Sequence, residues 1–141
     1  MVRPVAKVER FLRSQRVARL ATVDAHGHPH VVPIVFVYAA GRLYTPIDAK
    51  PKSVSPEHLQ RVRNILINPQ VQVLVDHYDD DWRKLGYVQV RGRAELIQRG
   101  DEYRSALRLL QRKYPQYARL PLEGRPFIKV SAENVVSWGK L

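Results

Sequence analysis

The chain has 141 residues, and its 24 lysines and arginines outnumber its 13 aspartates and glutamates, which gives a formal net charge of +11. This length suits one ordinary domain and is too short for two well-buried ones, so we expect a single domain over residues 1–141. Apolar residues make up 45% and charged residues 26%, a balance typical of globular proteins. The chain contains no cysteine, which excludes disulfides, thiolate metal sites and cysteine nucleophiles. The positive charge predicts attraction to an anionic partner.

The hydrophobic pattern does not predict a membrane protein. The longest mostly apolar stretch, residues 31–40, contains a proline and is about half as long as a membrane-spanning helix. The basic N-terminal residues are not followed by the apolar core of a signal peptide. We therefore expect a soluble cytoplasmic protein with no membrane partner.

The first half of the chain predicts one helix followed by three strands. Val5, Val8 and Leu12 have helical spacing, which indicates a short amphipathic helix over residues 3–15. The strands that follow are joined by short turns that contain glycine. Because parallel strands need long crossovers, these turns favour an antiparallel meander. The predicted strands are residues 16–24, 29–38 and 43–47.

The second half predicts further strands interrupted by two helices. Leu59, Val62 and Leu66 indicate a helix that begins after the Ser-Pro pair at 55–56 and stops before the Asn-Pro pair at 68–69. A second helix is predicted over residues 101–114. In the predicted strand over residues 87–97, Gly92 marks a candidate β-bulge. The predicted strands are residues 71–76, 87–97, 127–131 and 135–138.

This count of six or seven strands and two or three helices defines the fold class that we expect. Strands that are neighbours in sequence and joined by short turns favour an antiparallel β-barrel over a doubly wound sheet. The predicted fold is therefore mainly β, a closed or partly open β-barrel with flanking helices.

Familiar catalytic motifs are absent from the sequence. It contains no GxSxG, GxGxxG, GxxxxGK or HExxH pattern, and its seven glycines are scattered singly. Any catalysis would therefore depend on a bound cofactor rather than on an assembled set of side chains, and we name no catalytic residue.

Two clusters suggest metal binding at first sight. His28 and His30 would share one face of a strand, and His26 precedes them. The cluster lies at a predicted hairpin tip, however, which favours a solvent-exposed turn over a metal site. The acidic residues at 76 and 79–81 lack the spacing, central glycine and final glutamate of a calcium loop. We predict no metal site.

A candidate anion site follows the third predicted strand. Lys50 and Lys52 lie in a proline-containing loop before a helix, where free backbone N–H groups and a positive helix end favour anions. At about 100° per residue, Arg63 lies near Leu59 on the helical wheel and Arg61 nearly opposite. We therefore expect Arg63 to reach inward at the edge of the buried face and Arg61 to be a surface charge.

The N-terminal segment offers a competing interpretation. Its basic residues recur at a spacing of about three, opposed only by Glu9, and such a helix face could contact nucleic acid or anionic lipid. No nucleic-acid-binding motif accompanies it, so a solvated face is favoured and nucleic acid is not the expected partner. The residues are Arg3, Lys7, Arg10, Arg13, Arg16 and Arg19.

Together these segments resemble the pyridoxamine-phosphate-oxidase-like split-barrel family. An N-terminal helix runs into RLATV, a GHP turn and a PIVF strand, and LYTPID, AKPK, a helix ending in NP, VQVLVDHYDDDW and YVQVRGRAELI follow in the family's order. The similarity covers residues 8–138. AKPK with VDHYDDDW is most similar to the branch assigned to deazaflavin-dependent oxidoreductases.

The resemblance implies a homodimer of split β-barrels, with flavin mononucleotide or its deazaflavin analogue, coenzyme F-420, bound between the subunits. It implies that Lys50 and Lys52, or Arg61 or Arg63 in their place, hold the cofactor's phosphate. The resemblance also implies cofactor-binding roles for five further residues. These are Thr45, Pro46 and Ile47 beside the ring system and phosphate, and Trp82 and Trp138 covering the ring from the partner chain.

The implied activity is hydride transfer to a small conjugated acceptor. The chain lacks the C-terminal substrate-binding segment of pyridoxamine phosphate oxidase itself, so pyridoxine phosphate is not the expected substrate. An acidic glutamyl tail on the deazaflavin would suit a basic groove. The alternatives are a flavin reductase that uses a nicotinamide donor, and a non-enzymatic cofactor- or nucleic-acid-binding protein.

Overall fold

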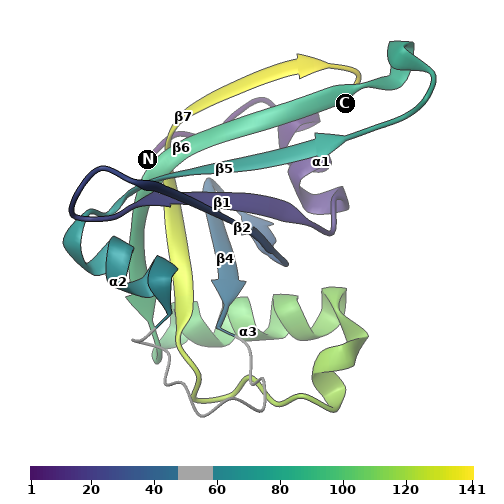
Figure 1. Cartoon of the computed structure of the whole chain (residues 1–141). Coiled ribbons are helices and arrows are strands. Elements are labelled where there is room, and N and C mark those ends of the chain that lie inside the picture. The colour runs from purple at the N-terminus through teal and green to yellow at the C-terminus, as the bar shows by residue number, and fades with distance from the viewer. Residues whose placement is uncertain (48–58) are drawn as a thin grey trace.

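The computed structural model describes residues 1–47 and 59–141 and shows a seven-stranded curled antiparallel sheet with flanking helices (Figure 1). The sheet order is β2-β1-β5-β6-β7-β4-β3. The strands are β1 (Ala18–Val23), β2 (Pro29–Ile34), β3 (Val37–Ala39), β4 (Arg42–Pro46), β5 (Gln70–His77), β6 (Gly86–Ile97) and β7 (Phe127–Gly139). The helices are α1 (Ala6–Ser14), α2 (Gln60–Ile67) and α3 (Asp101–Lys113), with short 3-10 turns η2 (Trp82–Lys84) and η3 (Pro115–Ala118). This confirms the mainly β split-barrel prediction.

The connection between β2 and β3 explains why the sheet curls. These two strands form opposite edges of the sheet, yet only Val35 and Phe36 separate them in the chain. The two edges must therefore come together, which bends the sheet into a half-barrel. The prediction of one strand over residues 29–38 was wrong at this bend, where the fully buried Phe36 packs into the core.

β7 is continuous, so the prediction of two closing strands was also wrong. Opposite β6, Arg91 pairs with Asn134 while Gly92 pairs with Ala132, which leaves Glu133 as one extra residue on β7. This register shift is a β-bulge, and the candidate bulge at Gly92 is confirmed. A Cβ atom on Gly92 would lie 2.4 Å from the carbonyl oxygen of Ser131, so only glycine fits there.

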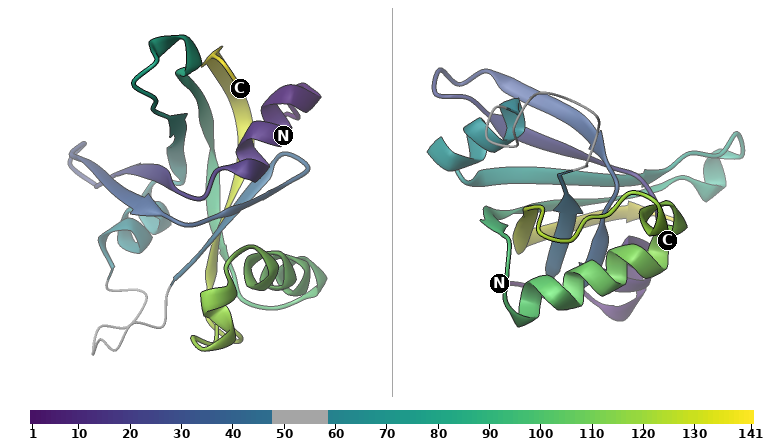
Figure 2. Two further views of the ribbon diagram at one scale, coloured as in Figure 1. Left: turned by 90° about the vertical axis from the view of Figure 1, so that its right-hand side faces the viewer. Right: turned by 90° about the horizontal axis from the view of Figure 1, so that it is seen from below.

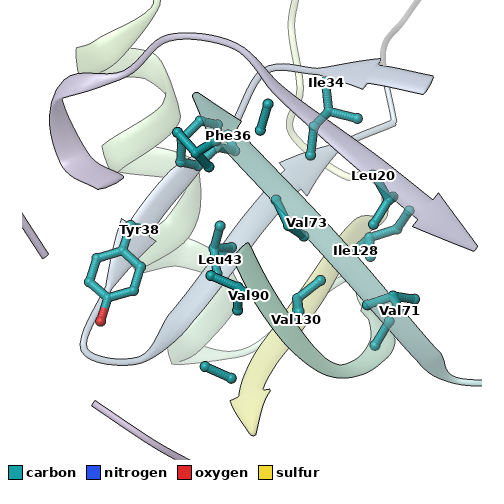
Figure 3. Close-up of a cluster of buried hydrophobic side chains, with 14 of the residues drawn as sticks. Leu20, Ile34, Phe36, Tyr38, Leu43, Val71, Val73, Val90, Ile128 and Val130 are labelled. Carbon is teal, nitrogen blue, oxygen red and sulfur yellow. The ribbon is translucent and has the colours of Figure 1, made fainter. Parts of the chain in front are cut away.

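The barrel interior holds one large apolar cluster (Figure 3). Alternate residues of the strands supply most of it, because successive side chains of a strand point to opposite faces. α1 contributes the buried Phe11 and Leu12, and α2 contributes Val62 and Ile65. The two helices therefore help to enclose the core from opposite sides of the molecule, as Figure 2 shows.

α3 packs on the outside of the barrel and is fastened to the β2–β3 bend. Lys113 Nζ donates to the carbonyl oxygens of Gln15 and Phe36 at 2.6 and 3.0 Å. Tyr114 Oη donates to the Phe36 carbonyl and accepts from the Phe36 N–H at 2.9 and 3.1 Å. Burial among these groups lowers the pKa of Lys113 to about 8, with a smaller effect from Arg16.

Glu9 anchors α1 to the β3–β4 hairpin. Its buried carboxylate accepts from Arg3 Nε and Nη2 at 3.2 and 3.1 Å, and from Tyr38 Oη at 2.5 Å. The Tyr38 hydroxyl in turn accepts from the Gly41 N–H at 2.9 Å. The hydrogen bonds from Arg3 and then Tyr38 lower the pKa of Glu9, whereas desolvation and Glu9 raise that of Tyr38 to about 12.

Across residues 1–47 and 59–141, none of the helices has the length and apolar character needed to cross a bilayer.

Candidate functional site

The end of β4 carries three of the residues expected to bind a cofactor. Thr45 pairs with Ile128 of β7 and Pro46 with Phe127, and Ile47 follows them. Thr45 and Ile47 are almost fully buried, at 3% and 2% exposure. The pairing between β3 and β4 ends at Tyr44. Among the described residues, Thr45 and Pro46 therefore have a neighbouring strand on one side only, which is β7.

Lys50 and Lys52 lie outside the described residues, within 48–58. Their expected role in binding phosphate stays a prediction. The described chain resumes at Leu59, directly before α2.

α2 presents its two arginines in the opposite order from the one expected. Arg61 is half-buried and Arg63 is exposed, so the expected burial of these two side chains was wrong. Leu59 is the N-cap and has extended backbone, with ψ of 139°, so it does not belong to the helical wheel on which we placed it. Val62, Asn64 and Ile65 form the buried face of the helix instead.

A chain of hydrogen bonds links Arg63 to the barrel. Asn64 Nδ2 donates to Thr22 Oγ1 of β1 at 2.9 Å, and both side chains are only 1% exposed. Gln60 Nε2 donates to Asn64 Oδ1 at 2.7 Å, and Arg63 donates to Gln60 Oε1. Sequence reasoning missed Thr22, Gln60 and Asn64. The one available signal was that Asn64 falls inside a predicted helix. Asparagine is unfavourable in a helix interior, so its presence there suggests that its side chain has a specific partner.

His30 lies beside this chain of hydrogen bonds. It is directly opposite Thr22 in the β1–β2 ladder, and its ring Nδ1 is buried with no hydrogen-bond partner among the described residues. A buried polar atom is costly unless it finds a partner, so this atom indicates a bound group that residues 1–47 and 59–141 do not supply. A flavin carries acceptor atoms on its ring edge and phosphate, so these residues fit such a cofactor.

His26 and His28 lie in the β1–β2 turn, where Asp24 organises the backbone. Asp24 Oδ1 accepts from the N–H groups of His26 and His28 at 2.8 and 2.9 Å. These hydrogen bonds, led by the one from His28, lower the pKa of Asp24. Within residues 1–47 and 59–141, no group of three or more His, Asp or Glu side chains is placed to hold a metal ion.

The two tryptophans lie at the other end of the molecule. Trp82 is 72% exposed in η2, and Trp138 is 53% exposed near the end of β7, where it stacks on Tyr87 with ring centroids 5.7 Å apart. β7 runs ten residues from Ile128, beside Thr45, to Trp138, or about 33 Å at the rise of a strand. One chain therefore does not bring Trp138 to the end of β4.

The comparisons with known proteins place this geometry in a family. A family profile described as pyridoxamine 5'-phosphate oxidase matches residues 5–139, nearly the whole chain. The chain belongs to the pyridoxamine 5'-phosphate oxidase-like family of split barrels.

A curated relative and two solved structures are similar along most of their length. The relative is the 5a,11a-dehydrotetracycline/5a,11a-dehydrooxytetracycline reductase of Streptomyces rimosus, 28% identical over 92% of this chain and 78% of that protein. An FAD-binding protein from Mesorhizobium loti has a TM-score of 0.66 at 24% identity, covering 96% of this chain and 95% of that one. HutZ, a heme storage protein of Vibrio cholerae, has a TM-score of 0.73 at 17% identity, covering 99% and 96%. The two structural similarities, both under 25% identity, establish the fold.

Proposed function

We propose that this protein is an oxidoreductase that binds a deazaflavin or flavin mononucleotide between two copies of the chain and transfers hydride to a small conjugated acceptor. Family membership over residues 5–139 and the similarity to a reductase support redox chemistry in general. The choice between the two cofactors, the homodimer and the cytoplasmic location are parts of the proposal.

Residues of β4, of α2 and of the segment between them would hold such a cofactor. Thr45 and Pro46 would lie along its ring and phosphate, and Lys50 and Lys52 would pair with the phosphate charge. The hydrogen bond from Arg63 to Gln60, itself tied to Asn64, limits where the guanidinium can point. When bound, the cofactor ring would supply the hydride transfer.

The single observation that carries this proposal is the buried Nδ1 of His30, which has no hydrogen-bond partner among the described residues and lies next to the Thr22–Asn64 hydrogen bond. This atom can donate or accept, depending on which ring nitrogen carries the proton. We infer that it makes a hydrogen bond to the cofactor. Trp82 and Trp138 would reach the ring from the partner subunit, because within one chain Trp138 is about 33 Å along β7 from the level of Thr45.

Cofactor titration of the Lys50→Ala/Lys52→Ala double variant tests the site. Each charge-assisted contact to phosphate contributes roughly 1.5–3 kcal/mol, so losing two should weaken binding by about a hundredfold or more. Fluorescence titration with flavin mononucleotide and with deazaflavin measures the dissociation constant. The charge-matched control is Arg108→Ala/Arg112→Ala, which removes two exposed cations of α3, outside the barrel, and should leave affinity unchanged.

The same titration separates the alternatives. Strong, salt-dependent binding of duplex DNA without affinity for either cofactor would contradict the redox proposal. Rapid oxidation of a nicotinamide donor with free flavin as acceptor would favour a flavin reductase. If Arg61→Ala abolished binding while the double lysine variant bound normally, α2 rather than the loop would hold the phosphate.

A further inference from the structure

A second charged region lies far from the end of β4. A cleft of about 690 Å³ is lined by α1, by the tip of the β5–β6 hairpin and by residues 140–141 after β7. Figure 1 shows α1 and the tip of this hairpin on the right-hand side of the view. Positively charged side chains from all three segments line this cleft, which we call the basic cleft. They are Lys7, Arg10, Arg83, Lys84 and Lys140.

The charge of the basic cleft is not balanced by its own side chains. Asp81 is the one acidic side chain among the described lining residues, and it is already bound to Arg83 Nε and Nη2, both at 2.9 Å. These contacts lower the pKa of Asp81 and raise that of Arg83. Four cationic side chains therefore remain, and no hydrogen bond or ion pair joins them to another described residue. They are Lys7, Arg10, Lys84 and Lys140.

This arrangement contrasts with the cations that the same chain pairs elsewhere. Arg19 lies 2.8 Å from Asp76, and Lys129 lies 2.9 Å from Glu102. Like charges that converge without a counter-charge repel one another, and a bound anion would relieve that repulsion. The convergence of three segments far apart in sequence on one cleft makes it a candidate anion site.

The cleft also has an apolar part. The buried Phe11 lies among the cationic residues of α1, and the half-buried Leu141 lines the cleft as well. A terminal phosphate group carries a charge of about −1.5 to −2 and three acceptor oxygens, and a second phosphate joined to it as a diphosphate adds about −1. A diphosphate therefore offsets most of the charge of the four unpaired cations. A flat ring could cover the apolar surface beside them.

We propose that the basic cleft binds a small molecule with at least two phosphate groups and a flat ring, as in a nucleoside diphosphate. Within one chain the cleft is separate from the proposed cofactor site, because β7 separates Ile128, beside Thr45, from the Lys140 end by about 12 residues, or roughly 40 Å. In the proposed homodimer Trp82 and Trp138, the neighbours of Arg83 and Lys140, would lie at the partner's cofactor, so the Lys50→Ala/Lys52→Ala variant is used to tell the two sites apart. This inference does not depend on the proposed function.

Calorimetric titration of the full chain with ADP, AMP and inorganic pyrophosphate tests the proposal. We expect ADP to bind at least tenfold more tightly than AMP, and pyrophosphate to compete with it. In the Lys7→Gln/Lys84→Gln variant, ADP affinity should fall at least tenfold. The charge-matched Arg99→Gln/Arg119→Gln variant, whose exposed side chains lie outside the cleft, should bind ADP like the wild type.

Other outcomes would overturn the proposal. Equal losses in the two charge-matched variants would mean that only net charge matters. Loss of ADP binding in Lys50→Ala/Lys52→Ala, with the cleft variant unaffected, would place the nucleotide in the proposed cofactor site. Duplex DNA that displaced ADP at lower concentration, and depended on Lys7 and Lys84, would make nucleic acid the ligand. If Lys7→Gln/Lys84→Gln failed to fold, Lys140→Gln would serve as the variant, and unchanged ADP affinity there would contradict the proposal.

Discussion

On one side of α1 the buried carboxylate of Glu9 accepts three hydrogen bonds from Arg3 and Tyr38, whereas on the other Lys7 and Arg10 face the basic cleft without a described partner. The same nine-residue helix thus carries one charged group that is fully partnered and others that are not. The paired charge joins elements of the fold, since Tyr38 belongs to β3. The unpaired charges join nothing within the described chain, and they are the ones available to a ligand.

The largest expected effect on stability comes from removing the partnered carboxylate of Glu9. Glu9→Ala removes the acceptor of three hydrogen bonds and leaves the buried Tyr38 hydroxyl without its carboxylate, so the free energy of unfolding should fall by about 2 kcal/mol. Urea denaturation followed by circular dichroism measures this loss. Lys7→Ala on the same helix should change it by less than about 0.5 kcal/mol. If the two variants lost equal amounts of unfolding free energy, the partnered and unpartnered charges of α1 would not differ in their contribution to stability.

A smaller effect is expected at the turn that Glu9 helps to hold. Gly41 has φ of +86°, and a Cβ atom there would lie 2.8 Å from the Val2 carbonyl oxygen. Gly27 has a similar φ of +83° but nothing within 4 Å of such an atom. Gly41→Ala should therefore cost about 1.5 kcal/mol and Gly27→Ala about 1 kcal/mol, since both strain the backbone and only the first also clashes. Thermal unfolding of the two variants measures their losses of stability. A larger loss for Gly27→Ala than for Gly41→Ala would contradict the close contact described at Gly41.

The smallest effect is a dependence on pH. Because the pKa of Glu9 in the folded protein is lowered, first by Arg3 and then by Tyr38, its contribution to stability is present above the ordinary glutamate pKa and is lost as the pH falls through the folded value. The difference in unfolding free energy between wild type and Glu9→Gln should therefore shrink as the pH is lowered from 6 toward 3. Urea titrations across this range measure the difference. A difference that stayed constant would mean that the carboxylate charge contributes nothing.

The sequence predicted the strands well where alternation and turns were clear, and poorly where the chain changes direction inside an apolar run. The bend at Val35 and Phe36 interrupts no hydrophobic pattern, because residues on both sides of it are buried against the core. In β7 the polar residues at the bulge, Glu133 and Asn134, looked like a break between two strands although the ladder to β6 continues past them. Neither feature is local, since each depends on which strand lies opposite.

The candidate site could be predicted only in part for the same reason. The sequence pointed to Thr45, Pro46 and Ile47 through a resemblance, and the structure places them together at the end of β4. The proximity of Thr22, His30 and Asn64 depends on strand register and helix packing, which a single sequence does not reveal. The basic cleft was hidden because its cations come from three distant segments. Sequence spacing had grouped Lys7 and Arg10 with Arg3 and Arg19, each of which has an acidic partner of its own.

The position of β7 in the sheet has a consequence for how the protein is made. β7 is the last strand in the chain, yet it lies between β6 and β4 and pairs with both. While the chain emerges from the ribosome from its N-terminal end, β1, β2, β5 and β6 can pair early, whereas the β3–β4 hairpin has no neighbouring strand until residues 127–139 appear. The open edges of β4 and β6 then offer unpaired backbone groups to other chains. Slower translation before residue 127 would therefore lengthen the period in which a nascent chain can aggregate.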